Sequence, residues 1–247
     1  MPETHRNPWR GPLLGSAVSL ALVLAALGGW LLGRAHSERS GGPPVLFTAP
    51  AYRNLTNQNG QKVSSADFRG KVRVVTFLFP YCNTFCPIIA AHLVGFEHLL
   101  QADGLADSVQ VVAFDVDPAG TGPKEMRGFL KEYGWDPQNT HWQYLTGTPK
   151  QIRTIVTGGY HVDYQKVADT GPDPDPKTQA ALLDGDTPQP YVANPLADKA
   201  NVKYDITHEN VLMLVDPEGR VRVIHAQADA VSQWELLKEV KAIQDSR

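Results

Sequence analysis

The stretch "KVRVVTFLFPYCNTFCPIIAAHL" (Lys71–Leu93) passes from one apolar pattern to another and carries both cysteines of the 247-residue chain, Cys82 and Cys86. Its first part is rich in β-branched and apolar residues, which predicts a strand buried on both faces. After the cysteines, apolar residues recur at i, i+4, i+7 and i+11 from Ile89, and Pro87 suits a first helical turn. The cysteines are therefore expected between a buried strand and the start of a helix.

The same alternation continues along the chain. A second buried strand is predicted at Val109–Asp117, then a helix at Lys124–Gly134 and a short strand at "WQYLTG". Thr148 and Pro149 suit the N-cap and first position of another helix. A hairpin around "DPEG" (Asn210–Ala226) and a closing helix complete the order β-α-β-α-β-α-β-β-α. Helices that alternate with buried strands predict an α/β domain with a central sheet flanked by helices.

The N-terminal part predicts a membrane span. No charged residue occurs from Gly11 to Gly33, and Trp9 and Trp30 lie near the two ends of this segment. About 20 apolar residues cross the roughly 30 Å core of a bilayer, whereas apolar regions of signal peptides are shorter, about 7–15 residues. A cleaved signal is the alternative, since Gly33–Ala35 offers small residues for cleavage. The predicted organisation is a tail (1–12), one transmembrane helix (13–33), a linker (34–44) and an exported domain (45–247).

Composition narrows the classes of function. The net charge of -3 and the lack of lysine or arginine runs argue against nucleic-acid binding. The segment 166–203 is rich in Pro, Asp and Gly, which predicts a long solvated loop. A lid that docks a partner is the alternative, because structureless loops of this length are uncommon in compact domains and often functional.

The spacing of Cys82 and Cys86 leaves three uses open. A disulfide that closes so short a loop adds roughly 2 kcal/mol, so a structural staple has little energetic motive. The N–H groups and dipole at a helix start favour thiolates, and i, i+4 spacing is expected to put both sulfurs on one side of a turn. This arrangement suits a reversible disulfide and equally suits a soft metal ion such as Cu(I) or zinc.

A metal site would need a further ligand. His208 stands out among the eight histidines because "YDITHENVLMLVD" places it in the loop that leads into the predicted hairpin. The segment begins like a zinc-protease H-E-x-x-H motif, but Leu212 stands where the second histidine would be. The other histidines flank the membrane segment, lie along the predicted helix or lie near the ends of predicted elements. They are His5, His36, His92, His98, His141, His161 and His225.

Taken in order, these motifs resemble the SCO/SenC family, thioredoxin-fold copper-binding proteins that assist assembly of cytochrome c oxidase. "LTNQNGQKVSSADFRGKVRVVTFLF" resembles the family's opening, "CNTFCP" its C-x-x-x-C-P element, and "AFDVDP", "FLKEYG" and "WQYLTGTPKQI" its middle. "YDITHENVLMLVDPEGRV" resembles its histidine segment and final hairpin, so the resemblance covers about residues 48–245. Asn83 and Tyr81 depart from the family's usual proline and small polar residue, and the loop 166–203 is longer.

The resemblance implies a thioredoxin-like fold with Cys82, Cys86 and His208 as ligands of Cu(I) or Cu(II), and with the two cysteines as a redox-active disulfide when oxidised. It implies a copper metallochaperone, with thiol–disulfide reductase activity left open, anchored in the bacterial inner membrane by a single span with its C-terminal domain in the periplasm. Its partners would be the copper-bearing subunit of the oxidase and other periplasmic copper chaperones.

The alternative is a thiol–disulfide oxidoreductase that keeps the copper-ligand cysteines of the oxidase reduced. Thioredoxin-like oxidoreductases usually carry C-x-x-C and a cis-proline in the loop that faces it. Here the spacing is C-x-x-x-C and the corresponding loop reads "DITHEN", without proline. Both features favour copper binding.

Overall fold

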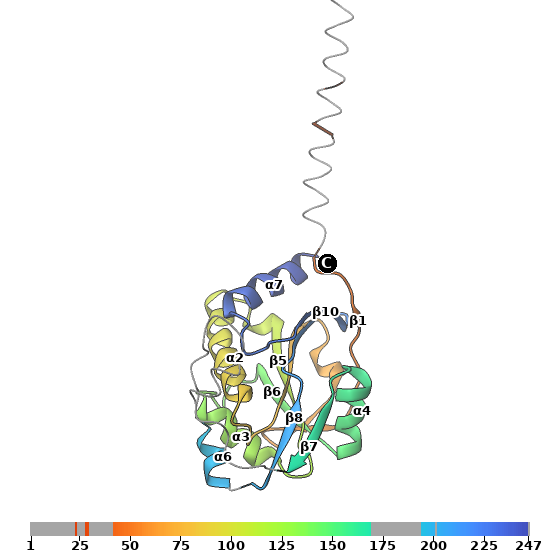
Figure 1. Cartoon of the computed structure of the whole chain (residues 1–247). Coiled ribbons are helices and arrows are strands. Elements are labelled where there is room, and N and C mark those ends of the chain that lie inside the picture. Colours follow the sequence, from red (N-terminus) through yellow and green to blue (C-terminus); the bar gives the residue numbers. More distant parts are fainter. Residues whose placement is uncertain (1–22, 24–27, 30–41, 169–193, 201, 247) are drawn as a thin grey trace, which may run out of the picture. The chain divides into compact units, whose positions relative to one another are not determined.

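The computed structural model (Figure 1) describes residues 23, 28–29, 42–168, 194–200 and 202–246. These include a compact unit that runs from Pro43 to Asp245. Most of the predicted transmembrane helix 13–33, most of the linker 34–44 and residues 169–193 of the predicted loop lie outside the described residues. Among those described, Phe85–Ala102 is long and apolar enough to cross a membrane, but 56% of it is buried inside the domain, so it is a core helix.

One sheet of eight strands forms the centre of the unit, in the order β1-β10-β9-β4-β5-β6-β2-β3. The parallel strands β4 (Val72–Leu78), β5 (Val109–Asp115) and β6 (Trp142–Thr146) lie in its middle. Strands β9 (Leu212–Val215) and β10 (Arg220–His225) continue it antiparallel from β4. All residues of β4 and β5 are buried, which confirms the prediction of strands covered on both faces.

Short strands complete this sheet, and two further strands form a separate ribbon. Strand β1 (Phe47–Thr48) pairs with β10, while β2 (Leu55–Asn57) and β3 (Lys62–Val63) form a hairpin beside β6. The second sheet holds β7 (Tyr164–Ala168) and β8 (Tyr204–His208), paired antiparallel. Strand β8 brings the end of the long predicted loop back toward the domain.

The helices cover the main sheet. In Figure 1, α2 and α7 lie on one side of the sheet and α4 on the other. Thr148 caps α4, as predicted, because its hydroxyl accepts a hydrogen bond from the backbone N–H of Gln151. The bounds are Phe85–Ala102 for α2, Pro123–Glu132 for α3, Pro149–Gly159 for α4, Pro195–Ala200 for α6 and Gln233–Asp245 for α7, with short 3₁₀ turns at Ser65–Phe68 and Ala106–Ser108.

The prediction of one unstructured loop over 166–203 is wrong at both ends. Residues up to Ala168 belong to β7, where Lys166 pairs with Ile206 and sets its ammonium 3.2 Å from the ring centroid of Tyr204. At the other end, Pro195–Ala200 forms α6. Backbone pairing across the ribbon, which local composition does not encode, supplies the order at the first end.

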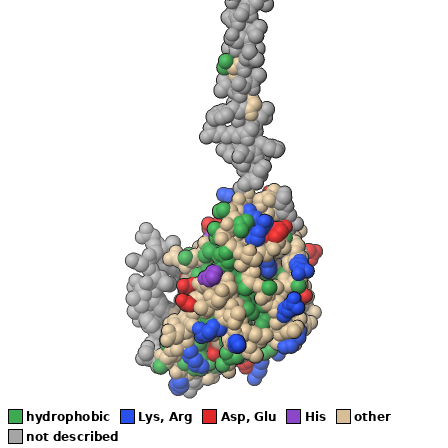
Figure 2. All heavy atoms as spheres, turned by 90° about the vertical axis from the view of Figure 1, so that its right-hand side faces the viewer, with side chains coloured by type: hydrophobic (Ala, Val, Ile, Leu, Met, Phe, Trp, Pro, Cys, Tyr) green, Lys and Arg blue, Asp and Glu red, His purple; other side chains and the backbone are tan. Residues whose placement is uncertain are grey.

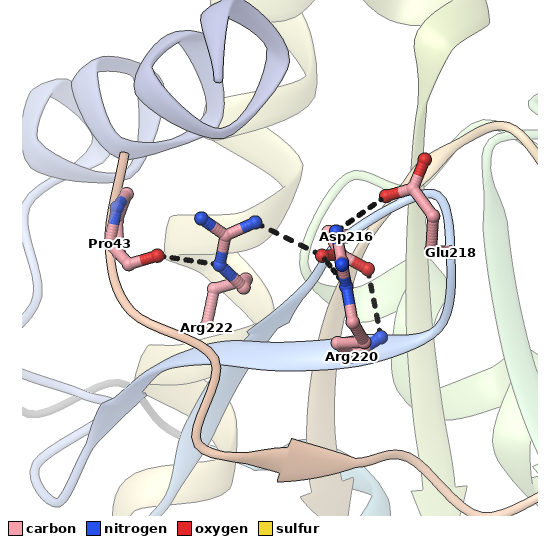
Figure 3. Close-up of polar contacts among 5 residues, drawn as sticks. All are labelled: Pro43, Asp216, Glu218, Arg220 and Arg222. Atoms are coloured by element: carbon pink, nitrogen blue, oxygen red, sulfur yellow. Dashed lines mark hydrogen bonds and ion pairs between the residues drawn. The ribbon is translucent and has the colours of Figure 1, made fainter. Parts of the chain in front are cut away.

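An ion-pair network fastens the start of the unit to the turn between β9 and β10 (Figure 3). The buried carboxylate of Asp216 accepts hydrogen bonds from Arg220 Nε at 2.7 Å and Arg222 Nη1 at 3.1 Å. Arg220 also reaches Glu218 at 3.0 Å, and Arg222 Nε donates to the carbonyl of Pro43 at 2.6 Å. Burial would raise the pKa of Asp216, but hydrogen bonds from the two arginines outweigh it and lower that pKa.

The face that carries α4 and β1 shows basic side chains scattered among acidic and neutral ones instead of joined into one band (Figure 2). This distribution agrees with the nearly balanced charge of the sequence.

Candidate metal centre

The two cysteines lie where β4 passes into α2. Cys82 is in the connecting turn and donates its backbone N–H to the carbonyl of Phe79 at 3.1 Å. Thr84 precedes the helix with a non-helical backbone (φ -106°, ψ -106°), and Cys86 follows in the first helical turn. The expectation that Cys82 and Cys86 belong to one helical turn is wrong, because the helix starts only after Cys82, but the two thiols do lie together and are hydrogen-bonded to one another.

The thiols differ in their surroundings. Both are free and buried, Cys82 with 4% and Cys86 with 0% of its surface exposed. A hydrogen bond from Cys86 lowers the pKa of Cys82, whose Sγ also lies 3.1 Å from Thr84 Oγ1. Burial raises the pKa of Cys86 well above its usual value. Cys82 is thus the first of the two thiols to ionise. This differs from the expectation that the helix start would favour both thiolates alike.

His208 is the last residue of β8 and not part of a loop, as the sequence had suggested. Its Nε2 lies 3.3 Å from Cys86 Sγ, and its Nδ1 lies 3.0 Å from the carbonyl oxygen of Glu209. Donation from Nδ1–H to this carbonyl assigns the tautomer and leaves the Nε2 lone pair toward the sulfur. Burial lowers the pKa of His208 to about 4, so the imidazole is neutral at physiological pH. Phe85 packs edge-on against the ring at 4.8 Å.

The structure thus brings together Cys86 and His208, which are far apart in sequence, and places Cys82 beside Cys86. The two thiols and His208 do not have all their ligand atoms within 4.8 Å of one another. Among the described residues, the group that meets this distance is His225, Glu235 and Glu239. One ion shared by Cys82, Cys86 and His208 therefore requires these ligand atoms to move closer together.

The other candidate histidines of the described part lie elsewhere. His141 is 3.8 Å from Asp107, and His161 packs edge-on against Phe47. His92 and His98 follow α2 beyond the first turn, and His225 bonds to Glu239 at 2.8 Å.

Asn194 supports the turn between β4 and α2 that carries Cys82, here called the cysteine turn. This role was not predicted from the sequence. Its buried amide donates to the carbonyls of Pro80 at 3.0 Å and Cys82 at 2.7 Å. Its Oδ1 accepts from the backbone N–H groups of Leu196 and Ala197, so it also caps α6. The Asn–Pro pair that opens α6 signals a cap in the sequence, but the reach of its amide to the cysteine turn requires the fold.

A polar group buried at the end of β5 was also missed. The Asp115 carboxylate accepts hydrogen bonds from Thr121 and Thr146, and burial raises its pKa to about 6. Burial also raises the pKa of Tyr144, and the charges of Asp115 and then Cys86 add to the effect. Tyr144 therefore lies near enough to both Asp115 and Cys86 for their charges to affect its pKa.

A surface depression of about 530 Å³ lies beside His208. The guanidinium of Arg153 covers the ring of Tyr164 at 4.6 Å within it. The remaining lining residues are Asp163, Gln165, Thr207 and Glu209. The imidazole thus lies next to open surface, whereas the two sulfurs are covered.

Comparison with known proteins gives a family match. A family model described as SCO1/SenC matches residues 48–188. The SCO1 protein homolog of Bacillus subtilis (strain 168) is 34% identical over 91 residues, which cover 37% of this chain and 45% of that protein. The chain spans about half the length of the first two curated relatives it matches, 45% and 47%.

Solved structures agree in fold. BsSco, described as a member of the Sco family of cytochrome c oxidase assembly proteins with a disulfide switch, superposes with a TM-score of 0.58 at 20% identity, over 84% of this chain and 99% of that one. Bradyrhizobium japonicum ScoI with copper bound gives 0.56 at 20% identity, over 78% and 98%. These likenesses confirm the predicted thioredoxin-like sheet flanked by helices.

Proposed function

Because the chain belongs to the SCO1/SenC family, we propose that it is a membrane-anchored copper metallochaperone that serves the copper centre of cytochrome c oxidase. Cys82, Cys86 and His208 hold the copper in this proposal. The observation that carries it is the 3.3 Å contact between Cys86 Sγ and His208 Nε2, which joins the first turn of α2 to the end of the distant strand β8. The copper-bound structures of Sco proteins from Bradyrhizobium, Arabidopsis and yeast support the choice of metal.

The donor set suits copper. Two thiolates and one imidazole form a soft site, which favours Cu(I) and also accommodates Cu(II). His208 has no proton to lose at Nε2, because its pKa is about 4. Cys86 has a raised pKa, so copper must displace its proton, and the proton release makes the affinity dependent on pH.

Delivery requires contact with a recipient. The depression beside His208 gives a partner access to the imidazole while the sulfurs stay covered. In the proposal, the recipient is the copper-bearing subunit of the oxidase, and other periplasmic copper chaperones supply the metal. Withdrawal of His208 toward the open side would leave copper on the two sulfurs, ready for transfer.

The predicted anchor gives the location. A single span at 13–33 in the bacterial inner membrane would place the domain 45–247 in the periplasm. The linker 34–44 would let the domain move at most about 40 Å from the membrane, at ~3.5 Å per residue. Protease added to spheroplasts should therefore digest the domain and leave a membrane-bound fragment. A full-length chain recovered in the soluble fraction would argue against the anchor.

The same dithiol supports a second function, thiol–disulfide exchange with the oxidase. The observation in its favour is the split between the two thiol pKa values, since exchange begins from one thiolate. Copper binding and disulfide formation compete for the same sulfurs, so the oxidised domain should lose nearly all affinity for copper. Binding of copper should therefore lower the apparent reduction potential of the pair, about 30 mV for each 1.4 kcal/mol of preference for the reduced form.

A copper titration of the reduced full chain tests the site. We expect one copper per chain, with thiolate-to-Cu(II) charge-transfer bands that disappear in Cys82→Ser and Cys86→Ser. His208→Ala should weaken Cu(II) more than Cu(I), because two thiolates alone can hold Cu(I) in linear geometry.

The matched control is His225→Ala, since His225, Glu235 and Glu239 form the other metal-competent group. This variant should leave the charge-transfer bands unchanged. Bands that survive in His208→Ala but fade in His225→Ala would reject the proposed ligand set.

A further inference from the structure

Three metal-ligating side chains outside the proposed copper site converge where β10 meets α7. His225 is the last residue of β10, and Glu235 and Glu239 lie one turn apart on α7. A ligand atom of each lies within 4.8 Å of the ligand atoms of the other two, and no other such group of three is found among the described residues. The cluster therefore has what scattered surface carboxylates lack, three ligands directed at one place.

All three side chains can be reached from solution. Glu235 is exposed, and the side chains of His225 and Glu239 keep 16% and 21% of their surface accessible. An ion can therefore reach the ligand atoms without any opening of the core, and water can complete its coordination.

An ordinary ion pair explains only part of this cluster. His225 Nε2 lies 2.8 Å from a carboxylate oxygen of Glu239, which satisfies both groups. The carboxylate of Glu235 brings a second negative charge that this pair does not need. Like charges at i and i+4 on a helix repel each other, so the two glutamates destabilise α7 unless a cation lies between them. The arrangement is therefore better suited to a divalent ion than to the pair alone.

The donor atoms select the kind of ion. One imidazole and two carboxylates suit Zn²⁺, and three protein ligands with water in the fourth position is the arrangement of open zinc sites. Cu(I) prefers thiolates, and Mg²⁺ prefers six oxygen ligands. Ligand atoms around a tetrahedral zinc lie about 3.3 Å apart, which falls between the 2.8 Å contact and the 4.8 Å limit of this cluster.

The cluster is separate from the cysteines. Gly95 of α2 leaves the space that the side chain of Gln233 occupies at the start of α7. Gly95 follows Cys86 by nine positions on the same helix, which is about 13 Å along the axis. Helix α7 therefore begins beside the middle of α2, away from the turn that carries the sulfurs.

We propose that His225, Glu235 and Glu239 form a second metal site, which binds Zn²⁺ through the imidazole and one oxygen of each carboxylate, with water as the fourth ligand. The ion joins the end of β10 to α7 and replaces the direct contact between His225 and Glu239. No redox or covalent step is involved. Cu²⁺ competes for the same donors, but without a thiolate it adds no charge-transfer band, so these bands still report only copper at the cysteines.

A zinc titration of the full chain in detergent tests the proposal. The double variant Cys82→Ser/Cys86→Ser is used so that no thiolate contributes, and circular dichroism checks its fold. Competition with a chromophoric zinc chelator gives the affinity. A pH of about 8 is suitable, because the hydrogen bond to Glu239 raises the pKa of His225 and a bound proton competes with the metal. We expect one saturable Zn²⁺ that is lost in His225→Ala and is not displaced by Mg²⁺.

Glu235→Gln, in the same cysteine-free chain, is the sharper variant, because this side chain is exposed and its substitution leaves the pair of His225 and Glu239 in place. It should weaken zinc binding by about tenfold or more. The matched control is Asp245→Asn, which removes an exposed carboxylate from the same helix and should change nothing. No saturable binding, binding that survives in His225→Ala, unchanged affinity in Glu235→Gln, an equal loss in Asp245→Asn or displacement by Mg²⁺ would each show that the cluster is a surface ion pair and not a zinc site.

Discussion

The two ends of β4 carry polar clusters built in opposite ways. Near its first residues, Asp216 has fixed partners in Arg220 and Arg222, all within 3.1 Å (Figure 3). Beyond its last residues, Cys86 shares its contacts between a second thiol and His208, and each pairing depends on a proton. The first cluster fastens the fold. The second cluster leaves its sulfur and nitrogen atoms free to change partners, so the positions of these side chains depend on the residues packed around them.

The largest expected effect on stability concerns the ion-pair network around Asp216. Asp216→Asn should lower the free energy of unfolding by about 3–5 kcal/mol, because Arg222 is left buried without its counter-charge. Urea unfolding of the reduced full chain measures the change. Copper stoichiometry at the proposed site should remain the same in the folded variant.

The neighbouring Glu218→Gln is the control for this first prediction. It removes a carboxylate from the exposed rim of the same network and should cost no more than about 1 kcal/mol. Equal effects of the two substitutions would show that Asp216 is no more important than a surface ion pair.

The next largest expected effect is a difference in how the two clusters contribute to stability as the pH falls. His208 has a folded pKa of about 4, below the ordinary value of about 6.5, so the unfolded chain takes up a proton that the folded chain refuses. Its contribution to stability is present above about pH 6.5 and is lost as the pH falls toward 4, by about 2–3 kcal/mol. Asp216 has a lowered pKa, so its contribution persists until the pH falls below the ordinary value of an aspartate, about 4.

Unfolding of the metal-free, reduced chain and of His208→Asn at neutral and mildly acidic pH measures this difference. The variant should lose less stability than the parent between these conditions, and Asp216→Asn should lose as much as the parent. The comparison between proteins cancels Asp115 and Glu97, whose raised pKa values act in the opposite direction. A parallel pH dependence of all three chains would mean that His208 is solvated in the folded state.

Local sequence patterns predict the secondary structure of this domain better than they predict the contacts of the cluster formed by Cys82, Cys86 and His208. Strands β4 and β5, the start of α4 at Thr148 and the hairpin of β9 and β10 follow from local patterns of apolar residues and caps. The order of strands and the partners of Asp115 and Asn194 come from contacts between distant segments, which no local pattern records. The same reason explains why Cys82 and Cys86 were expected to be equivalent, although one lies before the helix and the other within it.

Substitution of Asn194 tests whether the turn that carries Cys82 depends on hydrogen bonds from a distant residue to keep its conformation. Asn194→Ala removes its hydrogen bonds to Pro80 and Cys82 and should cost about 2 kcal/mol of stability, since two buried carbonyls lose their donor. It should also speed hydrogen exchange in the cysteine turn, and Lys199→Ala, on the exposed surface of α6, should do neither. Unchanged exchange in Asn194→Ala would show that the turn holds its own shape.

The smallest expected effect distinguishes the two thiols from each other. Iodoacetamide should alkylate Cys82 faster than Cys86 near neutral pH, by about tenfold, which corresponds to ~1.4 kcal/mol. The reason is that the hydrogen bond from Cys86 lowers the pKa of Cys82, while burial raises that of Cys86. Mass spectrometry of the two alkylated positions over time gives both rates. Cys86→Ala should then slow the reaction of Cys82 by raising its pKa, whereas Cys82→Ala should leave Cys86 slow. If exposure alone set the rates, Cys86→Ala would leave Cys82 as fast or faster, and the split between the two thiols would have to be abandoned.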